Sequence, residues 1–81
     1  MGYRPHRKPK KIPAKLFAIR QRLELSQSQM ARLLKCNVSA ARLSEFETGA
    51  REPNLLVLLR YSEVAGVHME TIADDRLALP E

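Results

Sequence analysis

The sequence predicts an all-α protein, a compact bundle of about five short helices preceded by a basic extended arm. Apolar residues recur every three or four positions from residue 16 onward, the spacing of helices that bury one face. Residues that begin or end helices separate these stretches, and no sustained alternation of polar and apolar residues indicates a strand. The 81 residues, 44% of them hydrophobic, suffice for one small domain with a single core.

The arm covers residues 1–13, and a first helix is expected at about 14–24. The arm is basic and holds Pro5, Pro9 and Pro13, each of which lacks an N–H and disfavours helix in the residue before it. Pro13 also suits the first turn of a helix. The first helix is then expected to bury an apolar stripe of Leu16, Ile19 and Leu23.

Capping residues mark the second and third helices. Ser26 and Gln29 have the spacing of a capping box, so a second helix should begin there and bury Met30, Ala31 and Leu34. The third helix, at about 38–48, follows a polar break and is capped by either Asn37 or Ser39. It ends at Gly49, and its inward residues are Leu43 and Phe46.

Asn54 is a suitable cap for a fourth helix at about 55–65, which Gly66 ends. This helix is expected to bury Leu55, Leu58, Leu59 and Ser62. A last turn or two at about 68–73 completes a helical domain of 14–73 and adds Met69 and Ile72 to the core. Residues 74–81 are expected to form a short, frayed acidic tail.

The formal net charge of +5 is distributed unevenly along the chain. Residues 1–15 carry +6, residues 16–42 carry +4, and residues 43–81 carry −5. A basic arm and front half are the footprint of a polyanionic partner. A solubilising tail on an ordinary surface would give the same values, so the charge alone does not decide between the two.

Three stretches carry a recognisable pattern: LSQSQMA at 25–31, LSEFETG at 43–49 and REPNL at 51–55. Over about residues 14–73 the chain resembles the Cro/repressor-type (lambda-repressor-like, Xre-family) helix-turn-helix DNA-binding domain. The residues that agree with the family pattern in order and identity are Arg20, Gln27, Ala31, Ser44, Glu47, Gly49, Arg51 and Pro53. The resemblance implies a small, repressor-like transcriptional regulator that binds double-stranded DNA and reads the major groove with its third helix. It also implies a structural ion pair between Arg20 and Glu47.

One departure concerns the turn between the second and third helices. In the commonest members, 18 residues separate the glutamine and the glutamate of the pattern, whereas Gln27 and Glu47 are 20 apart. The family's turn glycine is also missing, and Lys35 or Asn37 occupies that region. Either the turn is longer, or the third helix begins earlier, at Val38 after an Asn37 cap.

A helix in the major groove presents the face opposite its core contacts, mostly from its N-terminal half. The outward residues, and hence the candidates for base contact, are Ser39, Ala40, Ala41, Arg42 and Glu45. Arg42 fits the O6 and N7 atoms of guanine, or else contacts a phosphate or only solvent. Glu45 either accepts from a cytosine amino group or orients Arg42, and Ala40 or Ala41 could touch a thymine methyl.

Candidate ligands of the DNA backbone lie at the start of the second helix and in the arm. Ser26 has helix capping alone as its alternative role, and Arg51 resembles a family position near the DNA backbone. The candidates are Ser26, Gln27, Ser28, Arg32 and Arg51, joined by Arg4, Arg7, Lys8, Lys10 and Lys11 of the arm.

A second apolar stripe on the fourth helix, formed by Val57, Tyr61 and Val64, suggests a surface for a homodimer or a protein partner. The alternative is that the last helix, or the arm through Ile12, covers it. The rival function is an antitoxin-like or adaptor module that uses this helix and the acidic back half to bind a protein.

Catalysis, metals and membranes find little support. The single cysteine, Cys36, excludes an internal disulfide, and His6 and His68 have no partner at ligand spacing. No apolar run approaches the roughly 20 residues of a membrane span. We therefore expect a non-enzymatic cytoplasmic protein, bacterial or phage-encoded and nucleoid-associated, with no cofactor, metal or small-molecule ligand.

Overall fold

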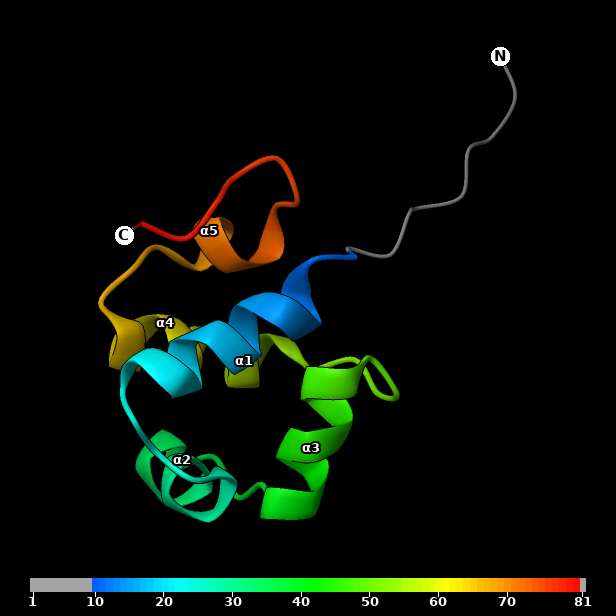
Figure 1. Ribbon diagram of the computed structural model, residues 1–81, viewed down its shortest axis with the longest axis vertical. Helices are drawn as coiled ribbons and strands as arrows, with labels where there is room; N and C mark the ends of the chain where they lie inside the picture. The colour runs from blue at the N-terminus through cyan, green and yellow to red at the C-terminus, as the bar shows by residue number, and fades with distance from the viewer. Residues whose placement is uncertain (1–9, 81) are drawn as a thin grey trace.

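The computed structural model describes residues 10–80, and this part of the chain consists of five helices and no strand (Figure 1). The all-α prediction is therefore confirmed. The helix α1 contacts α3, α4 and α5, while α2 packs against α3 and α4. The bounds are α1 Ile12–Arg22, α2 Gln27–Leu34, α3 Ala40–Thr48, α4 Leu55–Ala65 and α5 Met69–Ala73.

Side-chain caps fix where α2, α3 and α4 begin. The Ser26 hydroxyl accepts from the Gln29 N–H at 3.1 Å while the Gln29 amide oxygen accepts from the Ser26 N–H at 2.8 Å, which completes the predicted capping box. Ser39 caps α3 and Asn54 caps α4, each through an N–H three residues on. Ser39, and not Asn37, is thus the cap of α3. Gly49 and Gly66 end α3 and α4 in the left-handed conformation, as predicted.

The core gathers apolar side chains from all five helices, and each buried side chain contributes roughly 1.5–3 kcal/mol relative to exposure. The predicted inward residues of α2 and α3 are among them, except Ala31, which is half-buried and packs against this core. The six largest fully buried side chains are Leu16, Met30, Leu34, Leu43, Tyr61 and Ile72.

The prediction for α4 is partly wrong, because the helix is rotated relative to the expected orientation. Val57 and Tyr61, expected on an outer stripe, are only 3% and 0% exposed. Leu55 and Leu59, expected in the core, are 67% and 42% exposed. Residues 55–59 are all apolar, so several helix faces are equally hydrophobic, and the packing of α1, α2 and α5 decides which is buried. Leu58 and Ser62 are buried as predicted, and Val64 is half-buried.

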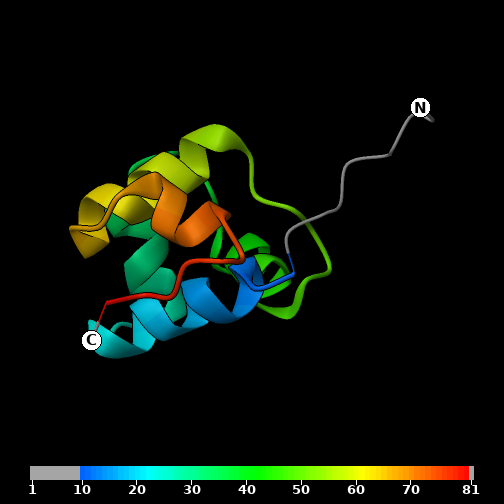
Figure 2. The ribbon, with the colours of Figure 1, turned by 90° about the horizontal axis from the view of Figure 1, so that it is seen from above.

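The expectation of a frayed tail is also wrong for the described part of that segment. Residues 74–80, here called the C-terminal segment, return along α1 (Figure 2). The Asp75 carboxylate accepts from the backbone N–H groups of Lys10 and Lys11 at 2.8 and 3.0 Å, at the start of α1. The buried Lys15 ammonium donates to the carbonyls of Thr71 and Asp74 at 2.7 and 2.8 Å. At the other end of α1, Arg22 donates to the Pro80 carbonyl.

The helix α1 begins and ends two residues earlier than predicted, at residues 12 and 22 instead of 14 and 24. The N–H groups that Asp75 binds belong to Lys10 and Lys11, directly before the helix. Leu23 consequently lies beyond the helix and is 38% exposed, not part of the predicted core stripe.

Candidate nucleic-acid interface

The helix α3 has one side in the core and one side open to solvent. Leu43 and Phe46 are buried. Of the five residues predicted to contact bases, Ser39, Ala41 and Arg42 are exposed, and Ala40 and Glu45 are half-buried. The core contacts thus hold α3 in place while its polar side remains accessible.

The turn between α2 and α3 is longer than in the common pattern. Lys35 and Asn37 both adopt left-handed backbone conformations, with φ of 52° and 62°, and α3 begins only at Ala40. A longer turn, and not an earlier α3, therefore accommodates the two additional residues. Cys36 and Val38 pack against the core and anchor the turn, and burial raises the pKa of the Cys36 thiol.

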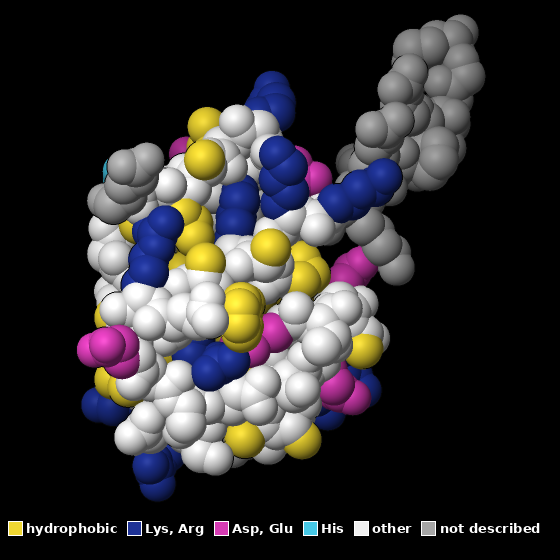
Figure 3. Space-filling view, viewed as in Figure 1, with side chains coloured by type: hydrophobic (Ala, Val, Ile, Leu, Met, Phe, Trp, Pro, Cys, Tyr) yellow, Lys and Arg dark blue, Asp and Glu magenta, His cyan; other side chains and the backbone are white. Residues whose placement is uncertain are grey.

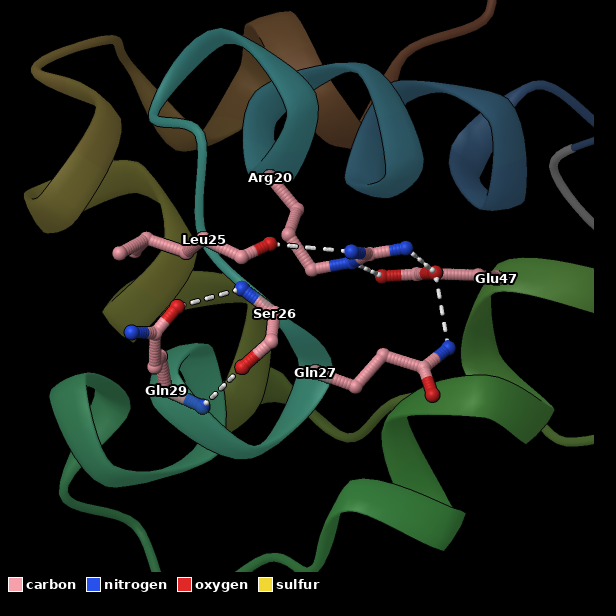
Figure 4. A network of polar contacts seen from close by, with 6 residues as sticks. All are labelled: Arg20, Leu25, Ser26, Gln27, Gln29 and Glu47. Atoms are coloured by element: carbon pink, nitrogen blue, oxygen red, sulfur yellow. Dashed lines mark hydrogen bonds and ion pairs between the residues drawn. The ribbon is translucent and has the colours of Figure 1, made fainter.

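A mostly buried polar network ties α1 and α2 to the end of α3 (Figure 4). Arg20 binds Glu47 through two contacts, Nε to Oε2 at 2.7 Å and Nη2 to Oε1 at 2.9 Å. Their side chains are 16% and 5% exposed, and the hydrogen bond to Glu47 raises the pKa of Arg20. Arg20 also donates to the Leu25 carbonyl at 3.0 Å, and the Gln27 amide donates to Glu47 at 3.3 Å. The family resemblance implied the Arg20–Glu47 pair, whereas the Gln27 contact was not anticipated.

A second, exposed cluster lies on the open side of α3. The Oε1 atom of Glu45 is 3.2 Å from Nε of Arg42 and 3.1 Å from Nε of Arg51. The side chains of Arg42, Glu45 and Arg51 are 45%, 44% and 50% exposed. The backbone N–H of Arg51 also donates to the Glu45 carbonyl at 3.3 Å, so the loop after α3 is attached to Glu45 twice. We call these three residues the Glu45 cluster.

The predicted ligands of the DNA backbone differ in how free they are. Ser28 and Arg32 are exposed on α2, while the Ser26 hydroxyl is engaged in its cap. Lys10 and Lys11 are exposed at the start of α1, and Arg4, Arg7 and Lys8 lie outside the described residues. In the view of Figure 3, lysine and arginine side chains are interspersed with acidic ones and form no single continuous patch.

Two absences hold for residues 10–80. No group of three histidine, cysteine, aspartate or glutamate side chains there could hold a metal ion. Within the same range, no helix has the length and apolar character needed to cross a membrane.

Two packed helices joined by a turn, the second with a buried apolar side and an open polar side, define a helix-turn-helix protein. The chain belongs to the helix-turn-helix family, whose model matches residues 16–72. Its fold is similar to that of the P22 c2 repressor, solved in complex with a synthetic operator in the presence of Tl+. That similarity has a TM-score of 0.70 at 22% sequence identity and covers 79% of this chain and 94% of that chain. No curated protein matches the chain.

Proposed function

We propose that this protein is a repressor-like regulator of transcription that binds double-stranded DNA sequence-specifically, with α3 in the major groove. The observation that carries the proposal is the division of α3, in which Leu43 and Phe46 anchor the helix and Arg42 remains accessible near its N-terminal end. A helix of this kind fits the major groove, and an arginine fork matches the O6 and N7 atoms of guanine.

The neighbouring elements support the same orientation. The Gln27–Glu47 hydrogen bond brings the start of α2 next to the end of α3. The N-terminus of a helix attracts phosphate through its free N–H groups and dipole. Ser28 and Arg32 on α2, and Arg51 after α3, can then bind the DNA backbone on either side of the groove. The operator complex of the P22 c2 repressor, which has a similar fold, makes this mode of binding the natural one to test.

The test is selection of binding sequences from a random duplex library, followed by affinity measurements on the selected and on random duplexes at several salt concentrations. We expect a clear preference for the selected duplex. Arg42→Ala should reduce that preference by about tenfold to a hundredfold, since one bidentate base contact is worth roughly 1–3 kcal/mol. Arg76→Ala is the matched control, because Arg76 is exposed on the C-terminal segment and carries the same charge. A folded protein that binds all duplexes alike, or none, would overturn the proposal.

We further propose that the protein acts as a homodimer whose two chains contact each other through α4. The predicted surface of Val57, Tyr61 and Val64 cannot serve as proposed, because the first two are in the core. The exposed apolar face of α4 consists instead of Leu55, Leu56 and Leu59, which lie within about 100° of one another around the helix axis. A symmetric contact there would bury this face and present two copies of α3 to half-sites about one DNA turn apart.

Sedimentation of the protein, alone and with a duplex carrying two half-sites, tests the dimer. Replacing both Leu56 and Leu59 by Glu should shift the mass to that of a monomer, whereas Leu77→Glu, at a similarly exposed leucine of the C-terminal segment, should not. A wild-type chain that stays monomeric at high micromolar concentration with and without the duplex would contradict the dimer.

The alternative, an antitoxin-like or adaptor role, rests on the same leucines and on the acidic back half. Two of those acids, Asp74 and Asp75, already have partners within the chain, which weakens this alternative. It would be favoured by a folded protein that binds no duplex. For a DNA-binding regulator we propose a cytoplasmic, nucleoid-associated location in a bacterium or phage-infected cell.

A further inference from the structure

The Glu45 cluster contains an arrangement that DNA binding as such does not require. One carboxylate oxygen of Glu45 accepts a hydrogen bond from Nε of Arg51 at 3.1 Å and forms an ion pair with Nε of Arg42 at 3.2 Å. Arg42 lies in the first turn of α3, whereas Arg51 lies in the loop that follows the helix. Glu45 therefore joins the residue best suited to read a base with a residue at the edge of the same surface.

The atoms that Glu45 uses leave the reading atoms available. It binds each arginine through Nε, and among residues 10–80 the terminal Nη atoms of Arg42 and Arg51 have no hydrogen-bond partner. Those terminal nitrogens can still donate to DNA while Nε remains bound to Glu45. The cluster thus keeps the guanidinium groups of Arg42 and Arg51 side by side while leaving their terminal nitrogens available to DNA.

The exposure of the cluster argues against a role in holding the fold together. All three side chains are about half exposed, and ion pairs in such positions add little to stability. Two guanidinium groups on one oxygen would otherwise repel each other and move apart. What the shared carboxylate provides is a common partner that brings both guanidinium groups together on the open side of α3.

We infer that Glu45 is a positioning residue that sets sequence specificity, because it couples base reading by Arg42 to backbone binding by Arg51. This inference rests on the proposed function. On DNA of the preferred sequence, the guanidinium groups of Arg42 and Arg51 contact the base and the backbone while they remain bound to Glu45. On other sequences they must break their contacts with Glu45 to reach phosphates, and the unpaired carboxylate then faces the negative DNA backbone. Glu45 should therefore lower the affinity for random DNA and raise the preference for the correct site.

The experiment compares Glu45→Gln with wild type on the selected and random duplexes at several salt concentrations. We expect a several-fold gain in affinity for the random duplex and a fall of about tenfold in preference. The slope of log K against log salt should steepen by up to about 2, since each newly neutralised phosphate adds about 0.9. Glu70→Gln on α5, an exposed site with the same change of charge, is the control and should change none of these by a comparable amount.

A second variant separates positioning from charge. Glu45→Asp keeps the negative charge but shortens the side chain, so it should reduce the preference while leaving the salt slope close to that of wild type. A wild-type protein without any preference would refute the proposed function itself. A selective wild type together with a Glu45→Gln variant that behaves like Glu70→Gln would refute only this inference.

Discussion

Glu45 and Glu47 lie two residues apart on α3, and both bind arginine, yet their surroundings differ completely. Glu47 is 5% exposed and binds Arg20 through both of its oxygens. Glu45 is 44% exposed and shares one oxygen between Arg42 and Arg51. Residues two apart project from different sides of a helix. The glutamate–arginine pair on one side of α3 therefore stabilises the fold, and we propose that the pairs on the other side position arginines for DNA recognition.

The largest expected effect is that of Glu47→Ala, which leaves the Arg20 guanidinium largely buried without its carboxylate. We expect the free energy of unfolding to fall by about 3–5 kcal/mol, measured by urea denaturation. Glu45→Gln should change it by less than about 1 kcal/mol, because its pairs are exposed. Equal losses in the free energy of unfolding of the two variants would show that Glu45 and Glu47 do not differ in their contribution to stability.

Deletion of residues 1–9 should lower the affinity for DNA without changing the free energy of unfolding. Like the substitutions at Glu45, it should affect binding and not stability. It removes Arg4, Arg7 and Lys8 but keeps the Lys10 and Lys11 N–H groups that bind Asp75. If each removed side chain neutralises one phosphate, the salt slope should become shallower by about 0.9 per side chain, and selected and random duplexes should lose affinity alike. An unchanged slope would show that the arm does not contact DNA.

Asp75 is an acid near the surface that nonetheless stabilises the fold, by accepting from the backbone N–H groups before α1. Hydrogen bonds from the backbone of Lys10 and Lys11 lower its pKa below the ordinary 3.8, and those from Arg76 lower the pKa of Asp74 to about 2. A carboxylate whose pKa is lowered in the folded state stabilises it above the ordinary pKa and loses that contribution as the pH falls further.

Asp75→Asn should therefore melt at a lower temperature than wild type at neutral pH. The difference should shrink as the pH falls below 3.8, where wild type loses the same contribution. Thermal melting of both proteins across this range is the measurement. A difference that persists unchanged at the acidic end would exclude Asp75 ionisation as its source.

The smallest effect is expected at Tyr61, beside the buried pair. Its hydroxyl is buried and has no hydrogen-bond partner among the described residues, and burial raises its pKa. Tyr61→Phe removes an unsatisfied polar group, so stability should stay within about 1 kcal/mol or rise slightly. A large loss in the free energy of unfolding, measured by urea denaturation, would reveal a hydrogen-bond partner for this hydroxyl. Tyr61 would then belong to the stabilising network of Arg20 and Glu47.

Local signals predicted the parts of the fold that depend on local chemistry. Ser26, Asn54 and Gly49 each act on backbone groups within a few residues, so their effects can be read from the sequence. The Arg20–Glu47 pair came from the family resemblance, because no spacing rule joins residues 27 apart.

The wrong predictions concern features that depend on packing between residues far apart in the sequence. The apolar run 55–59 leaves the buried face of α4 undetermined until its neighbours are in place. Asp75 binds backbone groups 64 and 65 residues away and lies beyond the range matched by the family model. At the candidate site, the sequence indicated that Glu45 could orient Arg42, but the attachment of Arg51 required the loop after α3 to turn back toward it.

Mapping amide chemical shifts on addition of the selected duplex would show whether the open side of α3 is the DNA-binding surface. We expect the largest changes on residues 39–45 and on Arg51, with smaller changes at the start of α2. Changes confined to α4 and α5, with α3 unaffected, would contradict it.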